Sequence, residues 1–307
     1  MKILKRIILL LILITIVTGV GNLILNFIER DKIIPYGTKI HLNTGDINIC
    51  DKGPKDGKVI VLLPGYGTIS PILDYSPLIE ELSKDFRVIA IEPYGYGDSD
   101  RTSAPRTIEN IGEEIHTVIE TLGIKKYILC GHSIAGIYSI YYLNKYPSEA
   151  IGFVGLDTSV PKQMSYDNSD FFGTLRKLAK DLGYIRVARF FYPVGFMATN
   201  DYYSNDIKKQ IAYRVNRDFA NPNNLDEGYN LERSWDMVKD MCYPKDLKCI
   251  FFLNKYDKET DSWRYIETKN AFDENKGKIY FLKGGHYIHR DNFKFISETI
   301  REQFGNR

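Results

Sequence analysis

Residues 126–146, KYILCGHSIAGIYSIYYLNKY, decide the fold of this chain. The segment Lys126–Cys130 is mostly apolar and reads as a buried strand, whereas Ile134–Tyr146 reads as a helix. Ser133 lies on the sharp turn between them. Such a turn presents the serine hydroxyl at the carboxyl end of a sheet, beside the backbone N–H groups that open the helix. This stretch predicts an α/β sheet that carries a nucleophilic serine.

The turn follows the pattern G-x-S-x-G from Gly131 to Ala135, except that alanine stands in the last glycine position. That glycine mainly allows the helix to approach the strand closely, and alanine is the next smallest residue. The substitution therefore weakens the match without removing it. The alternative interpretation is a turn of small residues that packs a helix on a strand and has no chemical role.

Short strands alternate with amphipathic helices on both sides of this turn, a pattern typical of a mostly parallel sheet with helices on both faces. The alternation stops between Pro161 and Leu247, where the pattern is helical throughout. The closing segment Phe293–Phe304 also reads as a helix. The expected strands around the turn are Val59–Leu63, Phe86–Ile91, Ile151–Leu156, Cys249–Leu253 and Lys278–Leu282.

Charge is balanced along the chain, with 41 basic and 39 acidic residues among 307. The small excess of positive charge lies in the first 29 residues, so the remainder is formally neutral. A chain without a basic surface excess is not expected to bind nucleic acid.

The N-terminal run Ile7–Ile28 carries no charged residue and is long enough to cross a bilayer as a helix. Three basic residues precede it, which places the N-terminus in the cytoplasm and the remaining chain outside the membrane. We expect residues 1–29 to be a single-pass transmembrane anchor. A cleaved signal peptide, with secretion of the mature protein, is the alternative.

A nucleophilic serine needs a base, a group that orients the base, and donors for the oxyanion. We predict that His286 is the base, because Gly284-Gly285-His286 follows the last strand and the two glycines allow the loop to approach the serine turn. His132 adjoins the serine and is read as structural. His289 is read as a residue that orients the following helix.

Two aspartates are candidates for the residue that orients the base. Asp257 comes directly after the strand that precedes His286, and we favour it. Asp157 ends the strand after the serine helix and is the alternative acid, although local bonding at the strand end also explains it. The expected oxyanion donors are the backbone N–H groups of Ile134 and of Tyr66, which lies in the loop after the first parallel strand.

These elements together resemble the α/β-hydrolase superfamily over about residues 37–307. The resemblance rests on Pro64-Gly65-Tyr66-Gly67, on the turn of residues 92–100, on the Ser133 turn, on the Asp257 loop and on Gly285-His286. The chain departs from the family pattern at Glu92, where aspartate is usual, and at Pro64, where histidine is usual. The resemblance implies a hydrolase core of residues 37–160 and 248–307, with residues 161–247 as a helical cap over the active site.

The cap is rich in aromatic residues, with 15 between positions 161 and 245. Those rings either line a pocket for an acyl chain or form the small core of the cap, and the sequence does not separate the two. Serine rather than aspartate at the turn disfavours the similar dehalogenases and epoxide hydrolases.

The expected activity is hydrolysis of an ester or other acyl substrate with an apolar portion, through an acyl-enzyme on Ser133. The catalytic residues would be Ser133, Asp257 and His286, and this chemistry needs no metal and no organic cofactor. Two alternatives remain. One is an aminopeptidase or amidase that uses the same three residues, and the other is a catalytically silent binding protein on the same fold.

Overall fold

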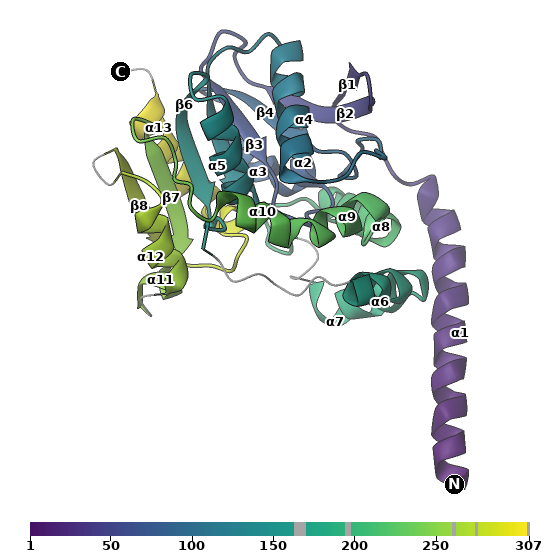
Figure 1. Cartoon of the computed structure of the whole chain (residues 1–307). Coiled ribbons are helices and arrows are strands. Elements are labelled where there is room, and N and C mark those ends of the chain that lie inside the picture. Colours follow the sequence, from purple (N-terminus) through teal and green to yellow (C-terminus); the bar gives the residue numbers. More distant parts are fainter. Residues whose placement is uncertain (163–169, 194–197, 260–261, 274–275, 306–307) are drawn as a thin grey trace.

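An eight-stranded sheet forms the centre of the protein, and helices cover both of its faces (Figure 1). The computed structural model describes residues 1–162, 170–193, 198–259, 262–273 and 276–305. The strands lie in the order β1-β2-β4-β3-β5-β6-β7-β8. Their bounds are Thr38–Leu42 (β1), Gly45–Lys52 (β2), Val59–Leu63 (β3), Arg87–Glu92 (β4), Tyr127–His132 (β5), Ala150–Leu156 (β6), Cys249–Asn254 (β7) and Gly277–Leu282 (β8).

Strands β1 and β2 pair antiparallel at one edge, and β2 also runs antiparallel to β4. All pairs from β4 to β8 across the sheet are parallel. Every residue of β3 and β5 is buried, because helices cover both faces of parallel strands. Because the strands from β4 to β8 across the sheet run parallel, their carboxyl ends meet at one edge of the sheet. The loops after β5, β6 and β8 come together there.

The helices divide into those of the sheet layers and those of an inserted region. The helices outside the inserted region are Lys2–Arg30 (α1), Pro71–Asp74 (α2), Ser76–Leu82 (α3), Ile108–Thr121 (α4), Ala135–Lys145 (α5), Lys255–Glu259 (α11), Trp263–Asn270 (α12) and His289–Phe304 (α13). Apolar residues of α4 and α5 form one core with one face of the sheet. Those of α3 and α13 form a second core with the other face.

Within the part of the chain that the structure describes, five helices are inserted between β6 and β7, in the interval that the sequence marks as helical (Figure 1). They are Asp170–Asp181 (α6), Tyr184–Phe191 (α7), Asn205–Asp218 (α8), Pro222–Tyr229 (α9) and Leu231–Val238 (α10). Two stretches of the expected cap, 163–169 and 194–197, lie outside the described residues. Helices α8 to α10 pack near the sheet domain, whereas α6 and α7 lie beside α1 (Figure 1).

The predicted fold class is confirmed, with its mostly parallel sheet and inserted helical region. The closing helix differs from the prediction, because it begins at His289 rather than at Phe293. Its first turn contains His289 and Arg290, which are buried through polar contacts with Asp74, and Asn292 interrupts the helical backbone. Apolar periodicity cannot reveal a turn that is buried by polar contacts.

The turn after β4 explains why glutamate replaces the usual aspartate at position 92. The two carboxylate oxygens of buried Glu92 accept four hydrogen bonds, from Tyr36 Oη, Ile72 N, Asn48 Nδ2 and Asp98 N. A Cβ atom on Gly97 would lie only 1.9 Å from Glu92 Oε2. The longer side chain therefore ties this turn to β2 and to α2, at the edge of the sheet where the parallel strands end.

Candidate active site

Ser133 sits in a strained turn between β5 and α5. Its φ is +54°, in the left-handed region that residues with a side chain seldom adopt. Two backbone hydrogen bonds, to the end of β6 and to the loop after it, hold this conformation. The Ser133 N–H donates to Leu156 O at 3.2 Å, and Ser159 N–H donates to Ser133 O at 2.8 Å. The turn is thus fixed by the loop after β6, and the Ser133 side chain remains partly exposed.

Small residues surround the turn because the backbone segments are close together. A Cβ atom on Gly131 would lie 3.0 Å from Ala135 Cβ, and one on Gly136 would lie 2.5 Å from Ser159 O. The methyl group of Ala135 is accommodated because Gly131 facing it has no side chain. The alanine in the last position of the motif is therefore compatible with the close approach of α5 to β5.

His286 connects Ser133 to a buried carboxylate. Its Nε2 lies 2.8 Å from Ser133 Oγ, and its Nδ1 lies 2.6 Å from Asp157 Oδ2. Because a carboxylate only accepts hydrogen bonds, Nδ1 carries the proton and Nε2 is left to accept one from the serine hydroxyl. The Asp157 side chain is 1% exposed and that of His286 is 43% exposed. The structure thus brings together a hydroxyl, an imidazole and a buried carboxylate in the arrangement that nucleophilic catalysis by serine requires, with the imidazole partly open to solvent.

The preference for Asp257 as the orienting acid was wrong, and the alternative Asp157 takes that position. Asp257 lies on α11, where its Oδ1 accepts from Ser262 Oγ at 2.7 Å. Its Oδ2 makes no hydrogen bond within the described residues and lies 3.8 Å from Arg264 Nη1. Asp157 follows β6, the strand next to β5, and its positive φ of +47° belongs to the sharp turn at which its side chain meets His286.

Two further residues complete the surroundings of Asp157, and sequence reasoning missed both. Arg264 Nη1 donates to Asp157 Oδ2 at 3.1 Å, and the Asn254 N–H donates to Asp157 Oδ1 at 3.2 Å. Asn254 Nδ2 also donates to Gly284 O at 2.5 Å, so this residue links the acid to the loop that carries His286. Asn254 ends β7, the strand next to β6, and a polar residue at the end of this apolar strand is the signal that could have identified it.

The other two histidines near the site are buried supports, in agreement with the structural interpretation of both. His132 Nε2 donates to His286 O at 3.0 Å, which holds the backbone of the base. Burial, followed by the nearby charges of His286 and His289, lowers the pKa of His132 well below its ordinary value, so its ring is neutral. His289 Nε2 lies 2.8 Å from Asp74 Oδ2 and ties the start of α13 to α2.

The loop after β3 passes directly against the serine turn. A Cβ atom on Gly65 would lie 2.9 Å from Ser133 Cβ and 2.5 Å from His132 Nδ1. The Tyr66 N–H therefore belongs to a backbone segment in contact with the nucleophile, and Ile134 N opens α5 on its other side. The assignment of these two N–H groups as oxyanion donors stays a prediction.

The aromatic rings of α6 and α7 follow neither of the two explanations offered for them. Phe171, Phe190, Phe191 and Tyr192 are exposed, so they neither line a pocket nor form a core, whereas Trp235 of α10 is buried. Tyr166 and Phe196 lie outside the described residues. The exposed rings therefore form part of the surface, whereas Tyr203, Trp235 and Tyr243 of the same region are buried.

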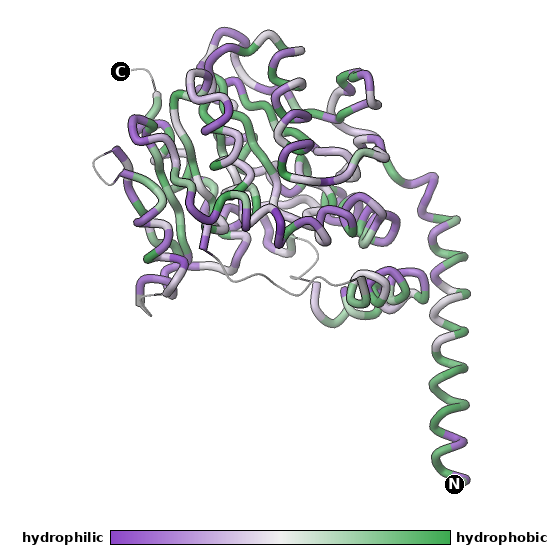
Figure 2. Tube along the Cα trace, viewed as in Figure 1, coloured by the Kyte–Doolittle hydropathy of each residue, from purple (hydrophilic) through white to green (hydrophobic). Residues whose placement is uncertain are grey.

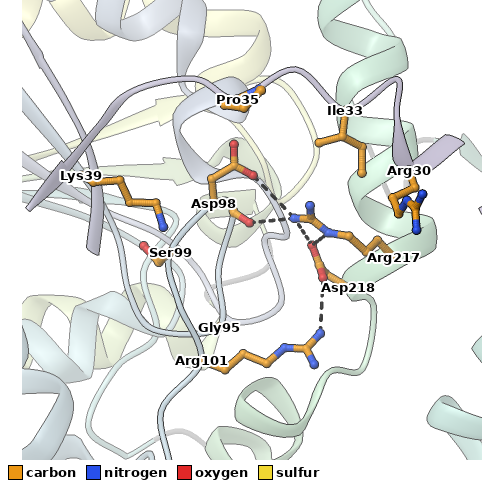
Figure 3. A pocket seen from close by; sticks show the side chains of 11 residues that line it. Arg30, Ile33, Pro35, Lys39, Gly95, Asp98, Ser99, Arg101, Arg217 and Asp218 are labelled. Carbon is orange, nitrogen blue, oxygen red and sulfur yellow. Dashed lines mark hydrogen bonds and ion pairs between the residues drawn. The ribbon is translucent and has the colours of Figure 1, made fainter. Parts of the chain in front are cut away.

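A cavity of about 520 Å³ lies away from the three residues of the site, where the chain leaves α1 (Figure 3). Figure 3 shows Arg217 between Asp98 and Asp218, with Arg101 beside Asp218. Lys39 and Arg30, also drawn there, pair instead with Asp100 and Asp31. In the described structure, none of the lining residues forms a hydrogen bond with Ser133 or His286.

Comparison with known proteins identifies the family. Residues 58–235 match the family model described as the alpha/beta hydrolase fold. The chain belongs to the α/β-hydrolase superfamily. In this member of the superfamily, Ser133, Asp157 and His286 are joined by hydrogen bonds. They come from the loops after β5, β6 and β8, respectively.

Two curated relatives match part of the α/β-hydrolase chain. An uncharacterized protein, YbdG of Bacillus subtilis (strain 168), is 30% identical over 129 residues, which are 41% of this chain and 39% of that protein. The bifunctional esterase/perhydrolase DCH of Acinetobacter calcoaceticus is 28% identical over 137 residues, which are 45% of this chain and 49% of that protein. The matched part spans less than half of the length of either relative.

Solved structures agree on the fold. The crystal structure of carboxylesterase CesB (YbfK) from Bacillus subtilis aligns with a TM-score of 0.61 over 92% of this chain and 96% of that chain, at 15% sequence identity. A likeness at this level of identity shows that the two chains share the α/β-hydrolase fold.

Proposed function

We propose that the protein is a serine hydrolase that cleaves an ester or other acyl substrate through an acyl-enzyme on Ser133. The observation that carries this proposal is the unbroken path Ser133 Oγ to His286 Nε2 at 2.8 Å and His286 Nδ1 to Asp157 Oδ2 at 2.6 Å. The esterase named among the relatives and the carboxylesterase named among the solved structures support it.

The hydrogen bonds support the following order of proton transfers. Ser133 Oγ attacks the substrate carbonyl carbon while His286 Nε2 takes the hydroxyl proton, and Asp157 stabilises the imidazolium that results. The negative oxygen of the tetrahedral intermediate would accept hydrogen bonds from the N–H groups of Tyr66 and Ile134. His286 then protonates the leaving alcohol. Water attacks the acyl-enzyme by the reverse sequence, which releases the acid and restores Ser133.

The proposal includes an anchor at the N-terminus. Helix α1 is long and apolar enough to cross a membrane, and most of its side chains are exposed in the described structure. We propose that it holds the enzyme on the membrane, with the N-terminus in the cytoplasm and the catalytic domain outside. The substrate would be a small molecule with an apolar portion.

A fluorophosphonate probe tests the proposal directly, because it labels a serine only where a neighbouring base activates the hydroxyl. We expect full-length wild-type protein in detergent to be labelled, and the Ser133→Ala variant to be unlabelled with an unchanged melting temperature. Ser139, a buried serine on α5, provides the matched control, so Ser139→Ala should still be labelled.

A substrate panel then separates the remaining activities. p-Nitrophenyl esters should be hydrolysed much faster than aminoacyl-anilides. A preference for the anilides would indicate an aminopeptidase or amidase instead. Absence of both labelling and turnover in folded protein would indicate a silent binding protein.

A further inference from the structure

Helix α1 carries a polar stripe through its apolar segment. Thr15, Thr18, Asn22, Asn26 and Glu29 recur every three or four residues, so their side chains share one face of the helix. A plain anchor needs no such stripe, because polar groups in contact with lipid lose their hydrogen bonds to water. The stripe therefore indicates that this face of α1 contacts protein.

The inserted helices meet this stripe. Asn22 Nδ2 donates to the carbonyl oxygens of Lys180 and Asp181 at the end of α6, both at 3.1 Å. On α7, the Tyr184 hydroxyl lies 2.5 Å from Thr15 Oγ1. A Cβ atom on Gly183, between the two helices, would lie 2.6 Å from Thr18 O, so the backbones are in close contact.

Arg186 of α7 joins three positions of the stripe. Its guanidinium donates to Asn22 Oδ1 and Asn26 Oδ1, each at 2.7 Å, and to both oxygens of Glu29 at 2.8 Å. Asn216 of α8 donates to Glu29 as well, at 2.9 Å. The polar groups of the stripe are thus bonded by the cap or, for Thr18, within α1 itself. The remaining surface of the segment Ile7–Ile28 is apolar and mostly exposed.

Helices α6 and α7 carry an exposed apolar surface. They expose large side chains, with Phe190 80% and Phe191 78% exposed. We call this surface the apolar face. It comprises Phe171, Leu175, Leu178, Val187, Phe190 and Phe191. An exposed surface of this composition next to a candidate membrane helix is typical of a membrane-binding site.

The charges of this segment fit a lipid surface. Residues 170–192 contain five basic and two acidic residues. Arg176, Arg186 and Arg189 bond to Tyr66, Glu29 and Ala212, so Lys177 and Lys180, beside Asp181, are the basic side chains that remain for a lipid surface. An amphipathic helix with basic and large apolar faces lies in the interface of a bilayer, with its apolar face about 5–10 Å deep. Asn22, which bonds the end of α6, is about 9 Å along the helix from Ile28, where the apolar segment of α1 ends. The end of α6 therefore meets α1 at about the depth expected of interfacial helices, whereas Tyr184 of α7 reaches Thr15, about 20 Å along the helix from Ile28.

We propose that α1 and the apolar face form one continuous lipid-binding surface, so that the cap lies in one leaflet of the bilayer beside its anchor. Figures 1 and 2 show α6 and α7 at the side of α1, whose length is mostly apolar. The occupant of the apolar face is the bilayer itself, because the face continues the apolar surface of α1 and carries basic residues beside it.

The same arrangement indicates a substrate class, and this part of the inference rests on the proposed hydrolase activity. Arg176 of α6 donates to the Tyr66 hydroxyl at 3.3 Å, and the backbone of Tyr66 is the expected oxyanion loop. The helix that contacts lipid on one side therefore contacts the active-site loop on the other. An ester with a long acyl chain, dissolved in the bilayer, would reach Ser133 along this helix.

Fluorescence quenching tests the lipid contact without any use of the enzymatic activity. A tryptophan at position 191, Phe191→Trp, is reconstituted as full-length protein in phosphatidylcholine and phosphatidylglycerol vesicles with or without brominated acyl chains. We expect the brominated lipids to quench the added fluorescence by half or more, relative to wild type carrying only Trp235 and Trp263. Phe295→Trp, at a 43% exposed position on α13 away from α1, is the control and should not be quenched.

A substrate comparison tests the route to the site. The double variant Phe190→Gln, Phe191→Gln should lose about tenfold activity on a long-chain ester held in vesicles, with unchanged activity on a short soluble ester. The same substitution at Phe295 should change neither rate. If neither ester is hydrolysed by the wild type, the hydrolase proposal fails while the quenching result still decides the lipid contact.

Fluorescence of Phe191→Trp that is insensitive to brominated lipids in vesicle-bound protein would overturn the proposal. Insensitivity combined with a dimer in detergent would assign the apolar face to a second copy of the chain.

Discussion

Arg264 Nη1 lies 3.1 Å from Asp157 Oδ2, the same oxygen that accepts the hydrogen bond from His286. The guanidinium also lies 3.8 Å from Asp257, so one cation stands between the two candidate acids. The carboxylate of Asp157 is buried, and a charge-assisted hydrogen bond from arginine holds it in place. Arg264 is thus a positioning residue that acts through Asp157.

Replacement of Arg264 should therefore slow the reaction without affecting substrate binding. We expect Arg264→Gln to lower kcat about tenfold, the value of one charge-assisted hydrogen bond, with KM nearly unchanged. Arg264→Lys should recover part of the loss because it restores the positive charge. A rise in KM at constant kcat would show that the residue contacts substrate rather than positions the acid.

The assignment of the acid gives a ranking of two variants. Asp157→Asn should lower kcat by about 10⁴-fold, because the amide no longer holds the productive tautomer of His286. Asp257→Asn should retain most of the activity, since Asp257 contacts Ser262 and Arg264 rather than the base. Steady-state kinetics on one p-nitrophenyl ester measures both, and the reverse ranking would return the role to Asp257.

The close contact between Gly65 and the serine turn predicts a steric effect. Gly65→Ala places a methyl group 2.9 Å from Ser133 Cβ, so the loop or the turn must move. A shift of this size should lower kcat by about 10²-fold. Gly285→Ala is the control, because a Cβ atom there meets nothing within 4 Å although it adjoins His286. Equal activity of the two variants would contradict the observed contact.

The neutral state of buried His132 predicts how stability depends on pH. The pKa of His132 is lowered well below 6.5, first by burial and then by the charges of His286 and His289. The unfolded chain therefore binds a proton near pH 6.5 that the folded protein excludes. The free energy of unfolding therefore has its full value above about pH 6.5 and decreases as the pH falls below that value.

Urea unfolding of the wild type and of His132→Gln at pH 7.5 and pH 5.5 tests this effect. The wild type should lose about 1 kcal/mol more than the variant between the two values, since one bound proton contributes about 1.4 kcal/mol per pH unit. Titration of other groups is common to both proteins and cancels in the difference. Identical pH dependence would show that His132 is not held neutral.

The contact between α1 and the cap predicts that Arg186 stabilises the protein and that the N-terminal helix is retained. Arg186→Ala leaves Glu29 without its guanidinium partner, and we expect the melting temperature of full-length protein to fall by several degrees. Arg189→Ala is the control, because the guanidinium of Arg189, on the same helix, donates to Ala212 O of α8. The membrane fraction should contain protein that retains residues 1–29. Mature protein that begins near Gly21 or Asn22 and is free in the medium would instead show a cleaved signal peptide.

The sequence by itself determined the order of strands and helices and the position of the nucleophile. Apolar runs of strand length, helical periodicity and small residues around Ser133 are local properties, and local patterns are enough to predict them. The glycines before His286 likewise marked a loop able to reach the serine. Glu92 was visible as a departure from the family pattern, but its four hydrogen bonds come from distant segments.

Only the tertiary structure decided between Asp157 and Asp257. Both follow parallel strands, and parallel strands bring their carboxyl ends to the same edge of the sheet, so chain order does not separate them. The choice depends on the turn at Asp157, with its positive φ, and on the packing of α11 and α12, which directs Asp257 toward Ser262. The exposure of the α6 and α7 rings and the pairing of Arg186 with α1 are also contacts between segments far apart in the chain. No local pattern encodes such contacts, because they form only when the inserted helices pack beside α1.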